Sequence, residues 1–218
     1  MTYEQLKKDP ALRAFIERAD QSLMTLGYTE HCYAHVGRVA DTAAYILLTM
    51  VYPDHQGELV QMAAYLHDIG NLVNRVEHSQ SGAVMAFCIL EKTDMPAEDI
   101  ATIVTAIGNH DEGTGVPVNA VAAALILADK SDVRRSRVRN QDVSTFDIHD
   151  RVNYSVMDSR LEIDASRNTI TLSLTVDSQY SSVMDYFEIF LQRMILCRKA
   201  AESLSLQFKL IINGQVLM

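Results

Sequence analysis

A carboxylate stands at the end of a long apolar stretch of this sequence. Residues 121–128 are all apolar, and Asp129 follows them on the same helical face as Leu125 and Ile126. A charged carboxylate on the buried face of a helix is costly unless it is paired or binds a metal. Asp129 therefore predicts a core helix that ends at a polar or metal-binding site.

Histidine and aspartate recur at the ends of other apolar segments. The pair His67-Asp68 ends the apolar stretch 59–66, again at the expected edge of a core. Imidazole and carboxylate groups without thiolate suit divalent first-row metals such as iron, manganese, zinc, cobalt or nickel. Three further histidines join this group of candidate ligands: His35, His78 and His110.

Residues 1–140 predict a mainly α-helical domain, because their apolar residues recur at helical spacing. We expect Thr29 to be the N-cap of the helix that ends before Pro53, and Gly70 to be the C-cap of the next helix. The expected helices span six segments: 11–26, 29–52, 58–68, 79–92, 94–108 and 118–133.

Residues 141–218 predict a small α+β appendage in the order strand, strand, helix, strand. Segments 161–164 and 169–176 alternate apolar and polar residues, as the strands of a hairpin do. A helix is expected at 181–204 and a strand at 207–212. Asn213-Gly214 then favours a tight turn. The role of this appendage is left open.

Composition narrows the classes of function. Hydrophobic residues make up 48% and charged residues 22% of the 218, which is typical of a globular protein. The net charge of −9 argues against general nucleic-acid binding. The three cysteines predict no disulfide framework, and no apolar run is long enough to span a membrane. Without a signal-peptide pattern, we expect a cytoplasmic protein with no membrane partner.

Five segments in order resemble the HD-domain superfamily of metal-dependent phosphohydrolases. One His-Asp dipeptide is a weak signal, whereas five matches with the right neighbours are specific. Together they cover about residues 30–132. The segments are His35–Val39, Tyr65–Gly70, His78–Ala83, Ala106–His110 and Ala128–Asp132.

The resemblance implies a metal site and a reaction. One metal would be held by His35, His67, Asp68 and Asp129. Versions of the superfamily with two further histidines bind a second metal, and His78 and His110 stand in their places. We therefore expect about two divalent metals per chain, with iron or manganese favoured over zinc, cobalt, nickel or magnesium. A hydroxide bridging the metals would attack phosphorus in a nucleotide or another small phosphate ester or anhydride. Asp68 and His110 are the predicted catalytic residues.

Other polar residues are candidates for binding the substrate. Arg38, Lys130 and Arg134 are predicted to contact its phosphate, because Arg and Lys bind phosphate. Asp132 is expected to support a ligand, and either Glu77 or Glu112 to act as general acid or base. His31 is expected beside the site or in solvent, and His55 has no expected role. The second His-Asp dipeptide, His149-Asp150, has no apolar helix before it and is interpreted as a chance match that leaves a substrate contact open.

Within the superfamily, the segments around His78, His110 and Asp129 look closest to a bacterial branch of di-iron hydrolases of dinucleoside polyphosphates. Residues 109–117 are faintly similar to the loop of cyclic-dinucleotide phosphodiesterases, but Val116 replaces their tyrosine. Asn71 stands where the superfamily often has lysine. Two alternatives stay open: a di-iron oxygenase with the same ligands, and a non-catalytic nucleotide-binding regulatory module. Self-association as a homodimer through the C-terminal strands is a further expectation.

Overall fold

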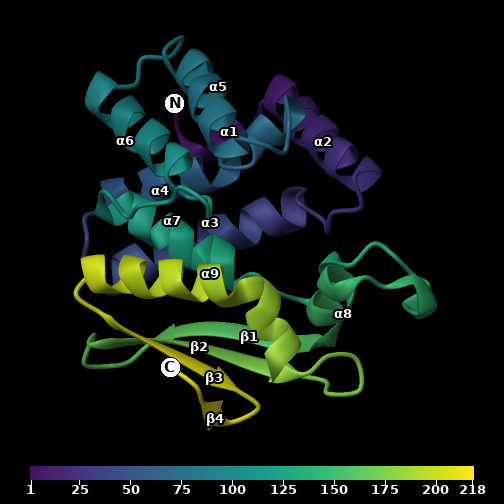
Figure 1. The fold of residues 1–218 in the computed structure, drawn as a ribbon. Helices are drawn as coiled ribbons and strands as arrows, with labels where there is room; N and C mark the ends of the chain where they lie inside the picture. The colour runs from purple at the N-terminus through teal and green to yellow at the C-terminus, as the bar shows by residue number, and fades with distance from the viewer.

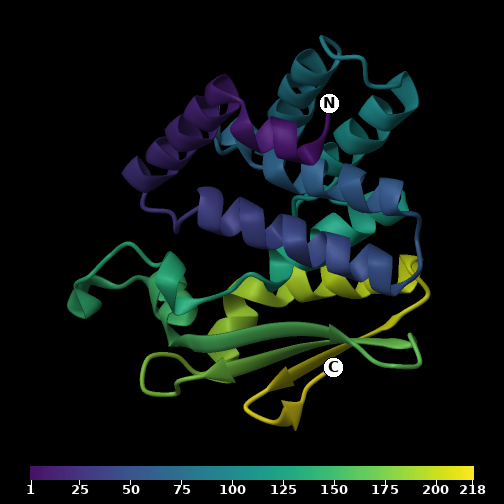
Figure 2. The same ribbon diagram turned by 180° about the vertical axis from the view of Figure 1, so that it is seen from behind.

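Helices dominate the first two thirds of the chain. The structure is a computed structural model that describes residues 1–218. Figures 1 and 2 show the helices stacked on one side of a small sheet, with the N-terminus among the helices and the C-terminus beside the sheet. The helices of this part are α1 (Tyr3–Lys8), α2 (Pro10–Thr25), α3 (Tyr33–Thr49), α4 (Asp54–Leu66), α5 (His78–Leu90), α6 (Ala97–Gly108) and α7 (Ala120–Ser131), with a 3-10 helix η1 (Ile69–Leu72) after α4.

Helix α7 is the centre of the core. Every residue from Val121 to Ala128 is buried, as is typical of a helix that is apolar on all sides. It packs against α3, α4 and α6 on one side and against the C-terminal helix on the other. This position carries Asp129, at the end of α7, into the middle of the molecule.

The C-terminal part is a four-stranded sheet covered by one long helix. Its strands are β1 (Val156–Ile163), β2 (Thr169–Val176), β3 (Gln207–Ile212) and β4 (Gln215–Val216), and its helix is α9 (Val183–Ser203). The order is β1-β2-β3-β4, with β2 and β3 parallel and the other pairs antiparallel. A parallel pair needs a crossover, and α9 supplies it. Alternating residues of β2 and β3 are buried, while the residues between them are more exposed.

Helix α9 lies between the sheet and the helical part (Figure 1). It contacts α7 on one side and β3 on the other, so the two parts share one continuous core. Short helices η2 (Arg135–Arg137), η3 (Val143–Thr145) and α8 (Ile148–Ser155) connect α7 to β1. None of the helices combines the length and the apolar character that crossing a membrane requires.

The predicted mainly α-helical class with a strand-strand-helix-strand appendage is confirmed, including the hairpin and the turn at Asn213. Two local predictions were wrong. Thr29 does not cap α3, which begins at Tyr33 after Cys32, without a side-chain cap. Gly70 is not the C-cap of α4, since the helix ends at Leu66 and Gly70 lies within η1. The boundary at residue 140 and the homodimer stay predictions.

Candidate metal centre

Close backbone packing places His67-Asp68 beside α5. The pair follows the last residue of α4, where the chain turns into η1. A Cβ atom on Gly70 would lie 2.0 Å from the carbonyl oxygen of His78 and 2.5 Å from the amide nitrogen of Gly82. Only glycine permits this approach. Gly70 therefore brings His78, the first residue of α5, next to the His67-Asp68 pair.

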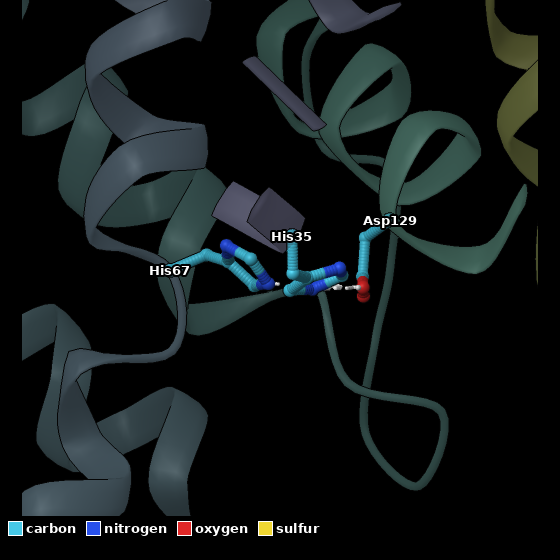
Figure 3. A group of neighbouring side chains, drawn as sticks. All are labelled: His35, His67 and Asp129. Carbon is cyan, nitrogen blue, oxygen red and sulfur yellow. Dashed lines mark ion pairs between the residues drawn. The ribbon is translucent and has the colours of Figure 1, made fainter. Parts of the chain in front are cut away.

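Helices α3 and α7 bring His35 and Asp129 to the same place. His35 Nε2 lies 3.4 Å from Asp129 Oδ1 and 3.7 Å from Asp68 Oδ2. His67 Nε2 lies 3.3 Å from Asp68 Oδ2 and 3.7 Å from Asp129 Oδ1. Figure 3 shows the rings of His35 and His67 reaching toward the carboxylate of Asp129 from separate elements. Four predicted ligands from three parts of the chain thus converge.

Each of the four predicted histidine ligands is held by its Nδ1 atom. Nδ1 of His67, His78 and His110 lies 2.6, 3.1 and 2.7 Å from the backbone carbonyl oxygen three residues earlier. Nδ1 of His35 lies 2.8 Å from Asp132 Oδ2. Because all these partners are acceptors, Nδ1 must donate, and a neutral ring then presents an Nε2 lone pair. Such contacts fix the tautomer and orientation that a metal ligand needs.

The buried Nε2 atoms of His35 and His67 make no hydrogen bond within the protein. Buried polar atoms are ordinarily paired, so two ring nitrogens without a hydrogen-bond partner beside two carboxylates need an explanation. The ligand atoms of His35, His67 and Asp129 lie within 4.8 Å of one another. A divalent metal fits this group, because it would satisfy both nitrogens and offset the carboxylate charge.

A second group of ligand atoms lies on the other side of Asp68. The atoms of His67, Asp68 and His110 also lie within 4.8 Å of one another. His78 Nε2 is 3.5 Å from Asp68 Oδ1, and its ring centre is 5.1 Å from that of His110. Asp68 therefore directs Oδ2 toward His35 and His67 and Oδ1 toward His78. Arg75 Nη1 lies 3.2 Å from His78 Nε2, so a metal on His78 would replace this contact.

Neighbouring residues set the charges of the centre. Burial opposes ionisation of Asp68 and Asp129, but His67 beside the first and Lys130 beside the second hold both pKa values well below the usual range. Burial also opposes a charged His67, yet the two carboxylates raise its pKa to about 10. Burial and the nearby His67 lower the pKa of His110 to about 3. The raised pKa means that a proton on His67 offsets part of the carboxylate charge, and a bound metal would take the place of this proton, whereas His110 is already neutral.

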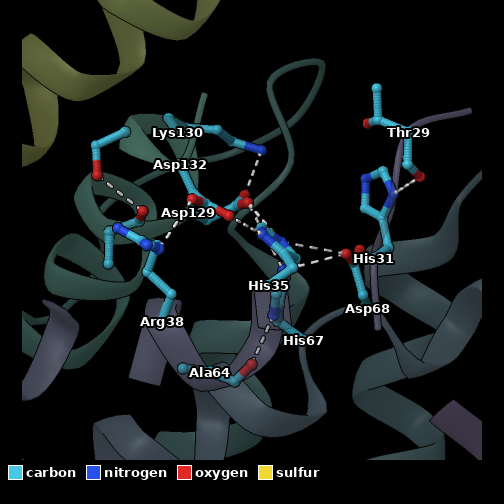
Figure 4. A network of polar contacts seen from close by, with 12 residues as sticks. Thr29, His31, His35, Arg38, Ala64, His67, Asp68, Asp129, Lys130 and Asp132 are labelled. Atoms are coloured by element: carbon cyan, nitrogen blue, oxygen red, sulfur yellow. Dashed lines mark hydrogen bonds and ion pairs between the residues drawn. The ribbon is translucent and has the colours of Figure 1, made fainter. Parts of the chain in front are cut away.

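The network around the centre is drawn in Figure 4, where Asp68 and Asp129 lie on opposite sides of the His35 ring. Lys130 Nζ contacts Asp129 Oδ2 at 2.7 Å and Glu112 Oε2 at 3.2 Å. Asn71, which replaces the lysine common in the superfamily, donates to Asp68 Oδ1 at 3.0 Å. These contacts orient the two carboxylates.

The centre opens into a cleft of about 360 Å³. His78, His110, Asp68, Asp129 and Lys130 form its floor. The walls come from distant segments. They include Tyr28 and His31 before α3, Arg75, Arg137, His149 on α8, and Phe190 and Arg193 on α9.

Two of the predicted phosphate-binding residues lie elsewhere. Arg38 and Arg134 line a separate cavity of about 720 Å³ between α3 and β1. Both contact the buried carboxylate of Asp132, at 3.6 and 2.9 Å. Asp132 also accepts the hydrogen bond from His35, so these arginines lie behind the candidate metal ligands and not in the cleft. Lys130 is the one of the three that the structure brings to the centre.

Two other sequence interpretations change with the structure. His149-Asp150, interpreted as a chance match, lies in the wall of the cleft. Glu112 forms ion pairs with Lys130 and Arg193, while Glu77 is exposed at the start of α5. Arg193 was missed altogether, because nothing in the local sequence of α9 distinguishes it from a surface arginine.

The sequence profile of the HD domain family matches residues 32–152, more than half of the chain. The chain therefore belongs to the HD domain family. It is 26% identical over 161 residues to an uncharacterized protein of Methanocaldococcus jannaschii. That match covers 64% of this chain and 62% of the relative, so the chain spans under two thirds of its length.

The chain is also similar to a solved structure. That structure is a predicted HD superfamily hydrolase from an uncultured Thermotogales bacterium, with a TM-score of 0.45 and 23% identity. The match covers 60% of this chain and 73% of the other.

Proposed function

We propose that this protein is a metal-dependent phosphohydrolase that acts on a nucleotide or another small phosphate ester or anhydride. One observation carries the proposal. Four histidines are locked through Nδ1 and gather around the carboxylates of Asp68 and Asp129, and two of them, His78 and His110, line a cleft together with both carboxylates. Buried ring nitrogens without partners do not stabilise a protein core, whereas a bound metal would satisfy them.

The arrangement of Asp68 favours a binuclear site. His35, His67, Asp68 and Asp129 would hold one metal, and Asp68, His78 and His110 the second. Iron or manganese suits this mixed imidazole and carboxylate set. When bound, the metals supply an activated water near neutral pH and offset negative charge on a phosphoryl group.

The protein's own residues position the reacting groups. Lys130 has three N–H donors, of which Asp129 and Glu112 take two. The third is free for a substrate oxygen. The cations Arg75 and Arg193 line the same cleft and favour an anionic ligand over a neutral one. Within the family, di-iron hydrolysis of dinucleoside polyphosphates is the reaction that we favour.

Hydrolysis of p-nitrophenyl phosphate and of a nucleotide panel tests this proposal. We expect release of phosphate after loading with manganese or iron, loss with a chelator, and a fall of about a thousandfold in Asp68→Asn, since a metal ligand is lost. His55→Ala is the matched control, because His55 is exposed and pairs only with Asp99. Oxygen consumption by the iron-loaded protein without phosphate release would contradict the proposal and favour the oxygenase alternative.

A further inference from the structure

Helix α9 contributes two residues to the cleft, although it lies outside the matched family segment 32–152. Phe190 is buried on the face of α9 toward the helical part, and Arg193 follows it one turn later. The family fold does not supply these side chains. The C-terminal part therefore completes a site whose metal ligands all precede it.

Arg193 is held in a fixed position. Its Nε forms an ion pair with Glu112 Oε1, and its guanidinium lies over the Phe190 ring, 4.4 Å from the ring centre. No carboxylate other than that of Glu112 forms an ion pair with this guanidinium, and its terminal nitrogens Nη1 and Nη2 donate no hydrogen bond to another residue. A planar guanidinium braced on one edge leaves two parallel donors, the geometry that binds phosphate oxygens in pairs.

Glu112 ties this guanidinium to the metal centre. Its other carboxylate oxygen contacts Lys130, and Lys130 contacts Asp129. The series Arg193, Glu112, Lys130, Asp129 thus alternates in charge across the cleft. Arg193 lines the same cleft as the candidate metal ligands and is separated from Asp129 by two ion-paired side chains.

The other cations near Asp129 have no free pair of donors. Lys130 is shared by two carboxylates, and Arg137 donates to the carbonyl oxygens of Glu30 and Asp132 at 2.8 and 2.7 Å. Arg75 lies on the opposite side, beside His78 and over the Tyr28 ring. Arg193 is therefore the cation with free paired donors on the Asp129 side of the cleft.

We propose that Arg193 forms a subsite for a second phosphoryl group, so that the cleft selects compounds with two linked phosphoryl groups over phosphomonoesters. This inference rests on the proposed function, in which the metals hold the first phosphoryl group. The cleft volume of about 360 Å³ lies within the range of small-molecule sites. A nucleoside diphosphate is the simplest substrate of this class.

Binding of two phosphonates tests the subsite. Methylenediphosphonate carries two linked groups that cannot be hydrolysed, and methylphosphonate carries one. Calorimetry on the manganese-loaded protein measures both affinities. We expect wild type to prefer the diphosphonate, and Arg193→Ala to lower the ratio of the two affinities by about tenfold or more, because charge-assisted hydrogen bonds are lost.

Two further variants keep the result interpretable. Arg198→Ala removes an exposed arginine from the same helix and should leave the ratio unchanged. Arg193→Lys keeps the charge without the planar fork, so we expect an intermediate ratio even where the alanine variant unfolds.

Equal affinities in wild type, no binding of either probe, or an unchanged ratio in both Arg193 variants would overturn the subsite. Hydrolysis of p-nitrophenyl phosphate by wild type, measured in parallel, tests the proposed function separately. Activity with one phosphoryl group but no preference for two would remove the subsite alone.

Discussion

Nδ1 of His35 lies 2.8 Å from Oδ2 of Asp132, and both side chains are almost fully buried. Asp132 also accepts a hydrogen bond from Arg134 Nε at 2.9 Å. Burial opposes ionisation of Asp132, but His35 and the neighbouring arginines favour the charged form and hold its pKa well below the usual range. A carboxylate in this position fixes the ring of His35 and makes its Nε2 a better ligand. The pair therefore links the metal centre to the separate cavity that contains Arg38.

Removing the charge of Asp132 should weaken metal binding. We expect Asp132→Asn to raise the dissociation constant for manganese about 10- to 100-fold, the usual effect of losing the partner of a ligating histidine. Isothermal titration calorimetry with manganese measures this dissociation constant. Asp158→Asn is the control, since Asp158 lines the same cavity but pairs with the exposed Arg160. Equal affinities in the two variants would contradict the role of Asp132.

The contact between Gly70 and α5 should be sensitive to a single methyl group. In Gly70→Ala the new Cβ would overlap the carbonyl oxygen of His78, so the two segments must separate. We expect a loss of more than about 2 kcal/mol in the free energy of unfolding, measured with urea. At Gly113 the nearest atom to an added Cβ would lie at 3.6 Å. Gly113→Ala should therefore change the free energy of unfolding by about 0.5 kcal/mol or less. Similar values for both would refute the packing argument.

The helices and the six residues that gather at the candidate metal centre could be predicted from the local sequence alone. Apolar spacing fixes which helix face is buried, and Asp129 at the end of such a face already required a partner. Helix α8 was missed because Ile148–Ser155 is short and largely polar, and Ile148 and Val152 are its only aliphatic residues. Its N-cap Asp147 was the available signal.

Tertiary placement could not be predicted. Arg38 follows His35 by three residues on one helix, yet it lies on the far side of Asp132 and not in the cleft. Arg193 reaches the site only because the parallel pairing of β2 and β3 lays α9 against α7. Such positions depend on contacts between segments distant in sequence, which periodicity does not describe.

The three thiols should differ in reactivity. Cys88 is exposed, whereas Cys197 is buried and burial raises the pKa of its thiol to about 12. We expect Ellman's reagent at pH 8 to modify Cys88 rapidly and Cys197 only after unfolding, because the thiolate is the reactive form. Mass spectrometry of digested protein identifies the modified residue. Early modification of Cys197 would contradict its burial.

The raised pKa of Cys197 should also make the folded protein less stable as the pH becomes alkaline. The folded pKa of Cys197 is raised, so the unfolded chain loses the proton first, from about pH 8.5. The contribution of the protonated Cys197 thiol to the free energy of unfolding is complete below that pH and is lost as the pH rises toward 12. Between pH 8 and 10, Cys197→Ala should lose less stability than wild type in urea unfolding. An equal loss in both proteins would refute this assignment.

The metal content of the purified protein tests the central claim most directly. Elemental mass spectrometry after loading with manganese should find about two metals per chain in wild type and about one in His78→Ala, because His35, His67, Asp68 and Asp129 still hold the first. His55→Ala should retain about two. About one metal in wild type, or the same content in wild type and His78→Ala, would contradict a binuclear centre shared through Asp68.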